Sequence, residues 1–295
     1  MDWHGKRYYS FDSFLKNTFG EKIYKVSLDG GFTCPNRDGT IGTGGCIFCS
    51  EGGSGDFASD ARLSIQDQIT QGISLVAAKS PSSRYIAYFQ AFTNTYAPVS
   101  RLRQLFTEAM EDPRIAALAI GTRPDCLPSD VLSLLKELNN QKPVFVELGL
   151  QTIHPSTAGL IRRGYPLSCF EEAVWNLSSI GVWTVVHLIL GLPGETEEMM
   201  LESVRYLNSL PVHGVKFSML HILKGTDLAD MYREDPFPVF TMESYIDLIL
   251  RCIGNLRKDI VIHRLTGDGP RDLLIAPLWS LRKRTVLNEI AHQLK

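Results

Sequence analysis

The sequence predicts an α/β fold built on a parallel sheet, and three observations lead to this expectation. Short apolar segments alternate with amphipathic segments along the 295 residues, which is the pattern of consecutive βα units. Hydrophobic residues make up 44% of the chain, which is enough for a large buried core. No low-complexity segment or linker divides the chain, so we expect one main domain.

The expected strands are short runs rich in β-branched and aromatic residues, and a helical segment separates each from the next. They cover residues 23–29, 84–92, 114–121, 143–151, 182–190 and 214–222. Such βα units form either a doubly wound open sheet or a partial barrel. In both, functional groups collect at the carboxyl ends of the strands.

The domain boundaries are expected at one short extension on either side of this core. Residues 1–22 form the N-terminal extension, residues 23–235 the core, and residues 236–295 a C-terminal α/β extension packed on the core. Two prolines in residues 233–240 mark the second boundary, and a helix, a strand-like segment and a terminal helix follow it.

Charge and hydropathy exclude some classes of protein. A net charge of -2 argues against a globally basic nucleic-acid binder, although residues 257–284 carry seven Lys or Arg against three Asp. That local excess indicates either a phosphate-binding surface or a solvated basic face. No apolar run approaches the roughly 20 residues of a membrane span. The N-terminus lacks the apolar block of a signal peptide, so we expect a cytoplasmic protein without membrane contact.

The cysteines predict a metal site. Six in a chain of this length are too sparse for a disulfide scaffold, whereas Cys34, Cys46 and Cys49 lie in one glycine-rich loop after the first expected strand. A structural zinc site needs four ligands, and no Cys or His lies between Cys49 and Cys126. A four-iron cluster on three thiolates leaves one iron free for a non-protein ligand. A non-catalytic zinc or iron–sulfur module stays open as an alternative to an enzyme.

In its surroundings, the cysteine loop resembles that of the radical SAM enzymes. The aromatic residue Phe48 precedes the last cysteine, and "HLILGLPGE" at 187–195 resembles the GxIxGxxGE motif of that superfamily. The spacing Cys-x11-Cys-x2-Cys departs from the commonest spacing, Cys-x3-Cys-x2-Cys. The whole chain, including "TRPDCL", "RRGYP" and "HRLTGDGPRDLLIAPLWS", is similar to the YhcC/YtqA-type group, which is related to the radical SAM domain of the elongator catalytic subunit.

The resemblance implies a partial (βα)6 TIM-type barrel that binds a [4Fe-4S] cluster and S-adenosyl-L-methionine. Cys34, Cys46 and Cys49 are the implied metal ligands, and the cosubstrate is the implied ligand of the fourth iron. The implied chemistry is formation of a 5′-deoxyadenosyl radical, with an electron donor such as flavodoxin or ferredoxin. The implied substrate is tRNA, modified on the side chain of the wobble uridine, with a small molecule or a protein as the alternative.

Cofactor contacts are expected at the strand ends. The polar residues after the second strand stand where the superfamily has a Gly-Gly-Glu motif, and Gln151 shares a strand face with Glu147 by alternation. Together with the motif at 187–195, these considerations select Gln90, Thr93, Asn94, Gln151, Gly191 and Glu195.

Four further strand-end residues are candidates for chemistry on the substrate. Cys126 is either a hydrogen-atom donor, a ligand of a second metal, or an inert buried thiol. Arg123 and Asp125 are either a substrate clamp or an ion pair at a turn. His154 is either a general acid or base or a hydrogen-bonded structural residue.

Overall fold

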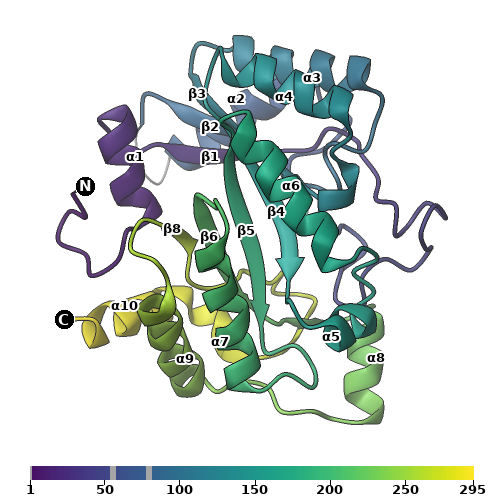
Figure 1. Cartoon of the computed structure of the whole chain (residues 1–295), viewed down its shortest axis with the longest axis vertical. Helices are drawn as coiled ribbons and strands as arrows, with labels where there is room; N and C mark the ends of the chain where they lie inside the picture. Colours follow the sequence, from purple (N-terminus) through teal and green to yellow (C-terminus); the bar gives the residue numbers. More distant parts are fainter. Residues whose placement is uncertain (1, 54–57, 78–81) are drawn as a thin grey trace.

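The computed structural model describes residues 2–53, 58–77 and 82–295, and a curled parallel sheet forms its centre (Figure 1). Within these residues the sheet has seven strands, in the order β1-β2-β3-β4-β5-β6-β8. The strands are β1 (Tyr24–Leu28), β2 (Tyr85–Phe89), β3 (Ile115–Thr122), β4 (Val144–Gln151), β5 (Trp183–Leu190), β6 (Gly214–Met219) and β8 (Val261–Arg264). The sheet curls into a half-barrel, which confirms the expected partial TIM-type barrel.

Helices cover the convex face of the sheet, because alternate strand residues turn apolar side chains toward them. Leu118, Val146 and Leu188 are fully buried in this core, together with Phe106 and Phe170 from the helices. The packed helices are α2 (Ile65–Ala77), α3 (Val99–Glu111), α4 (Ser129–Asn139), α6 (Leu167–Ser179), α7 (Glu197–Tyr206) and α9 (Met242–Asn255).

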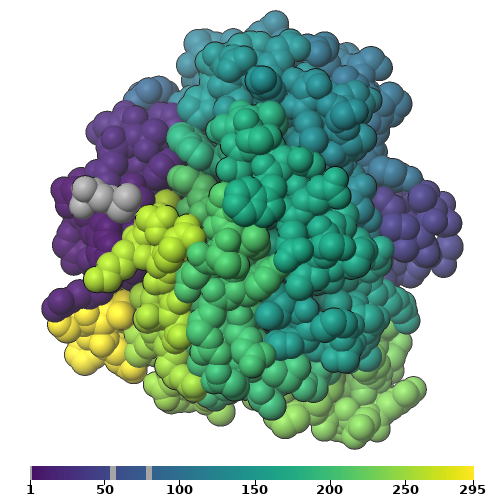
Figure 2. All heavy atoms as spheres, in the orientation of Figure 1, coloured from purple at the N-terminus to yellow at the C-terminus, as the bar shows by residue number. Residues whose placement is uncertain are grey.

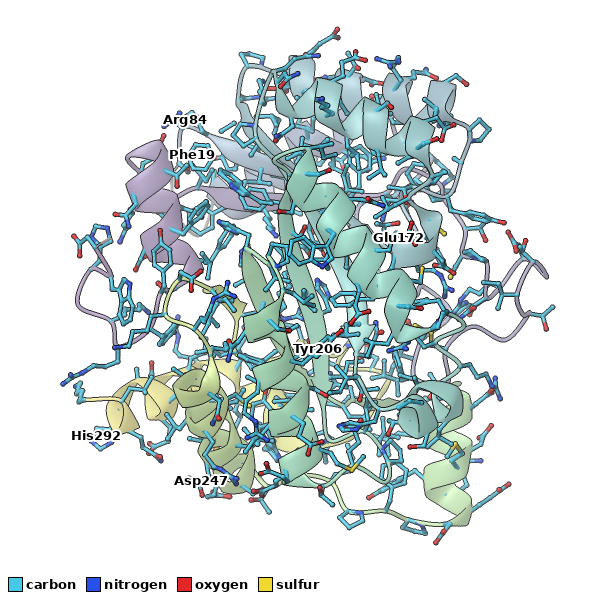
Figure 3. The ribbon with its side chains drawn as sticks, in the orientation of Figure 1. Phe19, Arg84, Glu172, Tyr206, Asp247 and His292 are labelled. Atoms are coloured by element: carbon cyan, nitrogen blue, oxygen red, sulfur yellow. The ribbon has the colours of Figure 1, made fainter. Side chains whose placement is uncertain are left out.

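A second, smaller core fills the concave face at the amino ends of the strands. Helix α1 (Phe11–Phe19) places Phe14 against Phe145 and Trp183, with ring centroids 6.1 Å and 5.1 Å apart. Ser10 caps this helix by accepting a hydrogen bond from the Ser13 amide at 3.2 Å. In Figure 3 the labelled Arg84, which precedes β2, lies beside Phe19 at the end of α1 and donates to its carbonyl.

The C-terminal segment completes the sheet rather than lying apart from it. Strand β8 pairs in parallel with β6, and the segment before α1 pairs with β8 through Ser10 and Ile262. Helix α10 (Lys283–Gln293) then returns to the N-terminal segment, where Arg7 donates to the Lys295 carbonyl at 2.8 Å. In Figure 2 the yellow C-terminal part of the chain lies beside the purple N-terminal part.

The remaining elements are short and lie at the edges. They are η1 (Pro124–Cys126), α5 (Pro155–Leu160), η2 (Leu207–Ser209), β7 (Ile222–Leu223), α8 (Asp227–Glu234), β9 (Leu274–Ala276) and η3 (Leu278–Arg282). Strands β7 and β9 form a separate antiparallel pair. In the part of the chain that the structure describes, no helix is both long and apolar enough to cross a bilayer.

The six expected strands are confirmed, and the larger differences from the structure lie at the carboxyl ends. The range 84–92 extends three residues beyond Phe89, because residues 90–97 form a loop. The range 214–222 joins two elements, because the chain leaves the sheet after Met219 and Ile222 begins β7. The strand-like segment of the C-terminal extension is β8, the seventh strand within the described residues.

Candidate metal centre and its surroundings

The cysteine loop leaves the sheet at the carboxyl end of β1 and projects at the right of the molecule in Figure 1. The amides of Arg37 and Asp38 donate to the Cys34 carbonyl at 2.8 and 3.2 Å, and the Cys49 amide donates to the Cys46 carbonyl at 3.0 Å. These bonds form one turn after Cys34 and another between Cys46 and Cys49. The three cysteines are free thiols of intermediate exposure.

Two neighbouring elements anchor the loop. The Ile47 amide donates to the Ile161 carbonyl at 3.4 Å, at the end of α5, and the Leu228 amide of α8 donates to the Ile47 carbonyl at 2.9 Å. Ile47, Ile161 and Leu228 are also buried together in a small apolar cluster. The loop is therefore fixed on both sides of Cys46 by backbone bonds and by burial.

Asn36 and Arg37 hold the loop from within. The Asn36 amide nitrogen donates to the Arg162 carbonyl at 2.7 Å and to Cys46 Sγ at 3.5 Å. The Arg37 guanidinium donates to the carbonyls of Ser50 and Glu51, and lies over the Phe92 ring. Both residues lie inside the predicted motif, but sequence reasoning missed their roles because it counted only metal ligands.

The environment of the thiols favours a negative charge. The pKa of Cys46 is lowered to about 7, chiefly by its hydrogen bond with Cys49, against the effect of burial. The charges of Arg123 and Arg37 contribute in the same direction. The pKa of Cys49 is raised, first by Cys46 and then by burial. The pair therefore releases one proton readily, and thiolates are the form that binds metal.

Arg123, Asp125 and Cys126 lie beside the cysteine loop. Arg123 Nε and Nη2 donate to the two carboxylate oxygens of Asp125 at 2.9 and 2.7 Å, which is a bidentate pair. The charge of Cys34 is near enough to raise the pKa of both Arg123 and Cys126. Burial is the main reason that the pKa of Cys126 rises to about 12, so this thiol stays protonated. Asp125 and Cys126 line a cavity of about 580 Å³ together with Pro35 and Thr40 of the loop.

The polar residues after β2 divide between two sites. The Thr93 amide donates to the Thr33 carbonyl at 3.1 Å, next to Cys34. Asn94 is fully buried and donates from its side chain to the Gly121 carbonyl at 2.8 Å, while its Oδ1 has no partner in the described residues. Gln90 instead accepts from Ser27 Oγ at 3.0 Å on the concave face.

Gln151 ends β4 in a left-handed backbone conformation with φ of 63°. A register shift against β5 occurs at the same place, between Gly149 and Gln151. The Gln151 amide folds back over Gly149, since a Cβ on that glycine would lie 2.4 Å from Nε2. Tyr165 donates to the Gly149 carbonyl and helps to fix this bulge. Such strain at a strand end is a common property of binding sites.

Glu195 and His154 belong to a separate network. Thr152 Oγ1 donates to Glu195 Oε1, and the His154 amide donates to Thr152 Oγ1 at 3.1 Å. The ring of His154 lies 2.8 Å from the Met199 carbonyl of α7 through Nε2. Burial raises the pKa of Glu195, and hydrogen bonds from Thr152 act against that rise.

Gly191 lies in the turn that follows β5. Its backbone is left-handed, with φ of 89°, and a Cβ there would lie 3.0 Å from the Phe240 ring. The structure therefore brings the three cysteines together with Arg123, Asp125 and Cys126. Glu195 and His154 instead make their described contacts with the end of β4, the turn after β5 and α7.

The donor set of the loop is three thiols, the ligand type of iron–sulfur clusters. Among the described residues, no three His, Cys, Asp or Glu side chains are grouped to hold one metal ion. In a four-iron cluster each thiolate binds a different iron, so the thiols need not converge on a point. The three thiols lie on one loop, flanked by the cations of Arg37 and Arg123.

A buried polar cluster that the sequence did not predict lies below the loop, on the concave face. Glu147 of β4 is fully buried and accepts hydrogen bonds from Lys25 of β1 and Lys216 of β6. It also accepts from the Tyr88 hydroxyl at 2.6 Å and lies 2.9 Å from His187 Nε2. Burial opposes ionisation of Glu147, but Lys216 and Lys25 outweigh it and hold the pKa of this carboxyl well below its usual value.

Comparisons with known sequences point to one family. A profile described as the Radical SAM superfamily matches residues 37–207, and a profile of the Radical_SAM C-terminal domain matches residues 212–295. YtqA of Bacillus subtilis is 42% identical over 290 residues, which cover 98% of this chain and 90% of that protein. YhcC of Escherichia coli is 37% identical over 281 residues, 95% of this chain and 90% of that protein.

More distant relatives share the fold over part of their length. The tRNA uridine(34) acetyltransferase of Methanocaldococcus infernus is 27% identical over 184 residues, which cover 61% of this chain and 33% of that protein. The solved structure of Elp3 from the same archaeon, with an N-terminal deletion, superposes with a TM-score of 0.66 at 18% identity. That match covers 91% of this chain and 63% of the Elp3 chain, and it shows the fold alone.

Proposed function

The chain belongs to the radical SAM superfamily, and from this membership we propose that it is an enzyme that binds a [4Fe-4S] cluster through Cys34, Cys46 and Cys49. The observation that carries the proposal is the composition of the loop, in which three free thiols lie beside two arginine cations. Three protein ligands leave one iron for S-adenosyl-L-methionine.

The cofactor supplies the difficult chemistry and the protein supplies orientation. When bound and reduced by a donor of the flavodoxin or ferredoxin type, the cluster and S-adenosyl-L-methionine provide a 5′-deoxyadenosyl radical that abstracts a hydrogen atom. Such a radical needs a site from which water is excluded, and the helices and α1 enclose the sheet on both faces.

Residues at the strand ends are proposed to orient the cosubstrate. Asn94 Oδ1 is a buried acceptor without a partner in the described residues, and the methionyl ammonium group is a donor that suits it. Gln151 and Gly191 both have left-handed backbone conformations at the carboxyl ends of β4 and β5. Thr93 fixes the loop beside Cys34, and Gln90, which accepts from Ser27, is proposed to face the substrate.

The remaining candidates are proposed to act on the substrate or to position the site. Cys126 keeps its S–H hydrogen at neutral pH, which is the state that a hydrogen-atom donor requires. Arg123 and Asp125 are proposed to clamp the substrate as a bidentate pair, of which Asp125 lines the neighbouring cavity. Glu195 and His154 are positioning residues, since their bonds connect the end of β4 to the turn after β5.

The proposed reaction is modification of tRNA at the side chain of the wobble uridine. The support is a sequence relationship. The tRNA uridine(34) acetyltransferase is 27% identical over a region that covers 61% of this chain, although that region is only 33% of the acetyltransferase. The basic residues of 257–284 are proposed phosphate contacts.

The cluster is tested by anaerobic purification and iron analysis. Wild-type protein is expected to be brown and to contain about four irons per chain. Alanine at Cys34, Cys46 or Cys49 is expected to abolish the colour, whereas the matched variant Cys169→Ala, at a half-buried cysteine of α6, retains it. Stoichiometric zinc in a colourless wild-type protein would instead support the non-catalytic binding module.

The reaction is tested in two steps. Reduced protein given S-adenosyl-L-methionine is expected to form 5′-deoxyadenosine, which an electron carrier would not do. Modified nucleosides in tRNA are then compared between a deletion strain and its parent. Identical nucleoside profiles would rule out the tRNA substrate and favour a small molecule or a protein.

A further inference from the structure

A cavity of about 1030 Å³ lies at the seam of the half-barrel, where the edge strands β1 and β8 face each other. Residues 5–12, both edge strands and α10 form its outer wall. Its inner wall reaches the concave face of the sheet at Tyr88, Gln90 and Lys216. The volume is large enough for a small ligand, since ligand sites are typically several hundred Å³.

The cavity is strongly basic. Among the described residues that line it, eight are Lys or Arg and two are Asp. The two aspartates already have partners, because Asp12 pairs with Lys16 at 2.9 Å and Asp268 pairs with Lys283. Glu147, which lies behind the inner wall, is shared by two lysines. The positive charge of the lining is therefore not balanced by the acidic groups of the protein.

Tyrosine rings hold several of these ammonium groups at the wall. The nitrogen of Lys22 lies 4.9 Å from the centroid of the Tyr24 ring. Lys25 and Lys216 lie over the Tyr88 ring at 4.5 and 4.7 Å. Cation–π contacts of this kind restrict long side chains that would otherwise be mobile in solvent. The basic lining is thus organised before any ligand binds.

Arg264 of β8 adds an unsatisfied donor to the inner wall. Its Nη2 donates to Ser218 Oγ, whereas its buried Nε has no partner within the described residues. The charge of Arg264 is also close enough to lower the pKa of Lys216, after burial and Lys25, which means that the two cations repel one another. A buried donor between like charges is a stable arrangement when an anion accepts from it.

We propose that this cavity binds the phosphate group of a phosphorylated substrate, with Arg264 and Lys216 as the groups that contact it. The lining has an excess of six positive charges, which is more than a ligand with a single carboxylate would neutralise. A phosphate monoester or a diphosphate carries more negative charge than a carboxylate and matches this excess better. The proposal names a substrate class for the proposed enzyme. That the bound molecule reacts rests on the proposed function, whereas binding of the phosphate does not.

The position of the cavity suits a substrate that reacts at the cysteine loop. Ser27 and Gln90, which line its inner end, lie at the carboxyl ends of β1 and β2. The Thr93 amide, three residues beyond Gln90, donates to Thr33 beside Cys34. A ligand held by its phosphate at Arg264 would therefore extend its other end toward the proposed cluster.

The test measures binding to the full chain by calorimetry, without S-adenosyl-L-methionine. The probes are uridine 5′-monophosphate and inorganic pyrophosphate, with uridine as the uncharged control. We expect both anions to bind and uridine not to bind. Arg264→Gln keeps a hydrogen-bond donor for Ser218 but removes the positive charge. This variant is expected to lower the affinity for both anions about tenfold or more.

The matched control is Arg251→Gln, at an exposed arginine of α9 that pairs with Glu197. It is expected to leave both affinities unchanged, and circular dichroism checks that each variant is folded. A second variant, Lys283→Gln, lies at the outer wall and tests the cavity without disturbing the buried cluster. Anions that fail to bind, or that bind equally to wild type and both cavity variants, would overturn the proposal.

Two further arms separate this proposal from the proposed function. Cys46→Ala is expected to bind uridine 5′-monophosphate as wild type does, because the cavity does not include the cysteine loop. Protein that cleaves S-adenosyl-L-methionine but binds neither anion would refute the cavity alone. An RNA hairpin that presents the anticodon loop with its wobble position is added as a competitor. Competition by the hairpin identifies RNA as the source of the phosphate, and its absence indicates a free nucleotide.

Discussion

Glu147 and Lys216 form a buried ion pair inside the half-barrel, although β5 separates their strands in the sheet. The side chain of Glu147 has no exposed surface and that of Lys216 is 9% exposed. Lys25 binds the other carboxylate oxygen. This one carboxylate therefore connects three strands and compensates charge in a region where water contributes little.

We predict that Glu147→Gln destabilises the protein by about 3 kcal/mol or more, because it leaves the buried Lys216 and the partly buried Lys25 without their counter-charge. Urea unfolding followed by tryptophan fluorescence measures the change. The double variant Glu147→Gln with Lys216→Met removes both members of the pair and is expected to be more stable than the single variant. A single variant as stable as wild type would show that the lysines are neutral in the folded protein.

His213, which packs beside Trp183 in the smaller core, leads us to predict a pH dependence of stability. Burial among aromatic rings lowers the pKa of His213 to about 4, so the unfolded chain takes up a proton first as the pH falls below about 6.5. Stability present above pH 6.5 is thus lost as the pH falls toward 4. For His213 alone the loss between about pH 7 and about pH 5 is roughly 2 kcal/mol.

His213→Phe is expected to remove this part of the pH dependence, since the ring still packs beside Trp183 but cannot take up a proton. The free energy of unfolding is compared at both pH values. The control is His292→Phe, at a histidine whose side chain is 75% exposed. The difference in its free energy of unfolding between the two pH values should equal that of wild type. An unchanged pH dependence in His213→Phe would contradict the assignment.

Two thiols are predicted to resist alkylation. Burial raises the pKa of both Cys126 and Cys252 to about 12, and neither is more than 6% exposed. Iodoacetamide at about pH 8 should leave both unmodified in the folded protein and modify both in urea. Peptide mass spectrometry reads the result. Rapid modification of Cys126 in the folded state would mean a reactive thiolate, which could not keep the hydrogen that a hydrogen-atom donor transfers.

The loop anchor Asn36 gives a prediction about metal content. Asn36→Ala removes the bonds to the Arg162 carbonyl and to Cys46, so the loop is expected to lose most of its iron after anaerobic reconstitution, while the fold persists. Iron and protein are quantified together. Asn17→Ala, which removes an exposed bond to Asp2, is the matched control and should retain full iron content. Equal iron in the two variants would show that the anchor is dispensable.

The strands could be predicted from the sequence because strand character depends on neighbouring residues. The proposed ligands of the loop are also a local pattern, since they lie within sixteen positions, Cys34 to Cys49. That Arg123, Asp125 and Cys126 act in the site stays a prediction, and its support is their position beside the cysteine loop, where parallel strands bring their carboxyl ends to one edge.

The buried cluster could not be predicted, because it depends on how the sheet curls. Lys25 and Glu147 are 122 residues apart, and a lysine within a short apolar strand is compatible with an exposed position. That Lys25 points into the half-barrel becomes clear only from the curl of the sheet, which brings β1 and β6 around one interior. Gln151 shows a different limit: alternation predicts that it shares a face with Glu147, but it predicts neither the register shift after Gly149 nor the left-handed backbone that brings the Gln151 amide over that glycine.

Helix α1 and its aromatic neighbours occupy only the amino half of the concave face. The space inside the half-barrel is consequently divided along its axis into a region of low dielectric constant and a region rich in fixed charge. Electrostatic forces on a guest molecule would differ sharply between these halves. The strength of an ionic contact inside the half-barrel therefore depends on its depth along that axis.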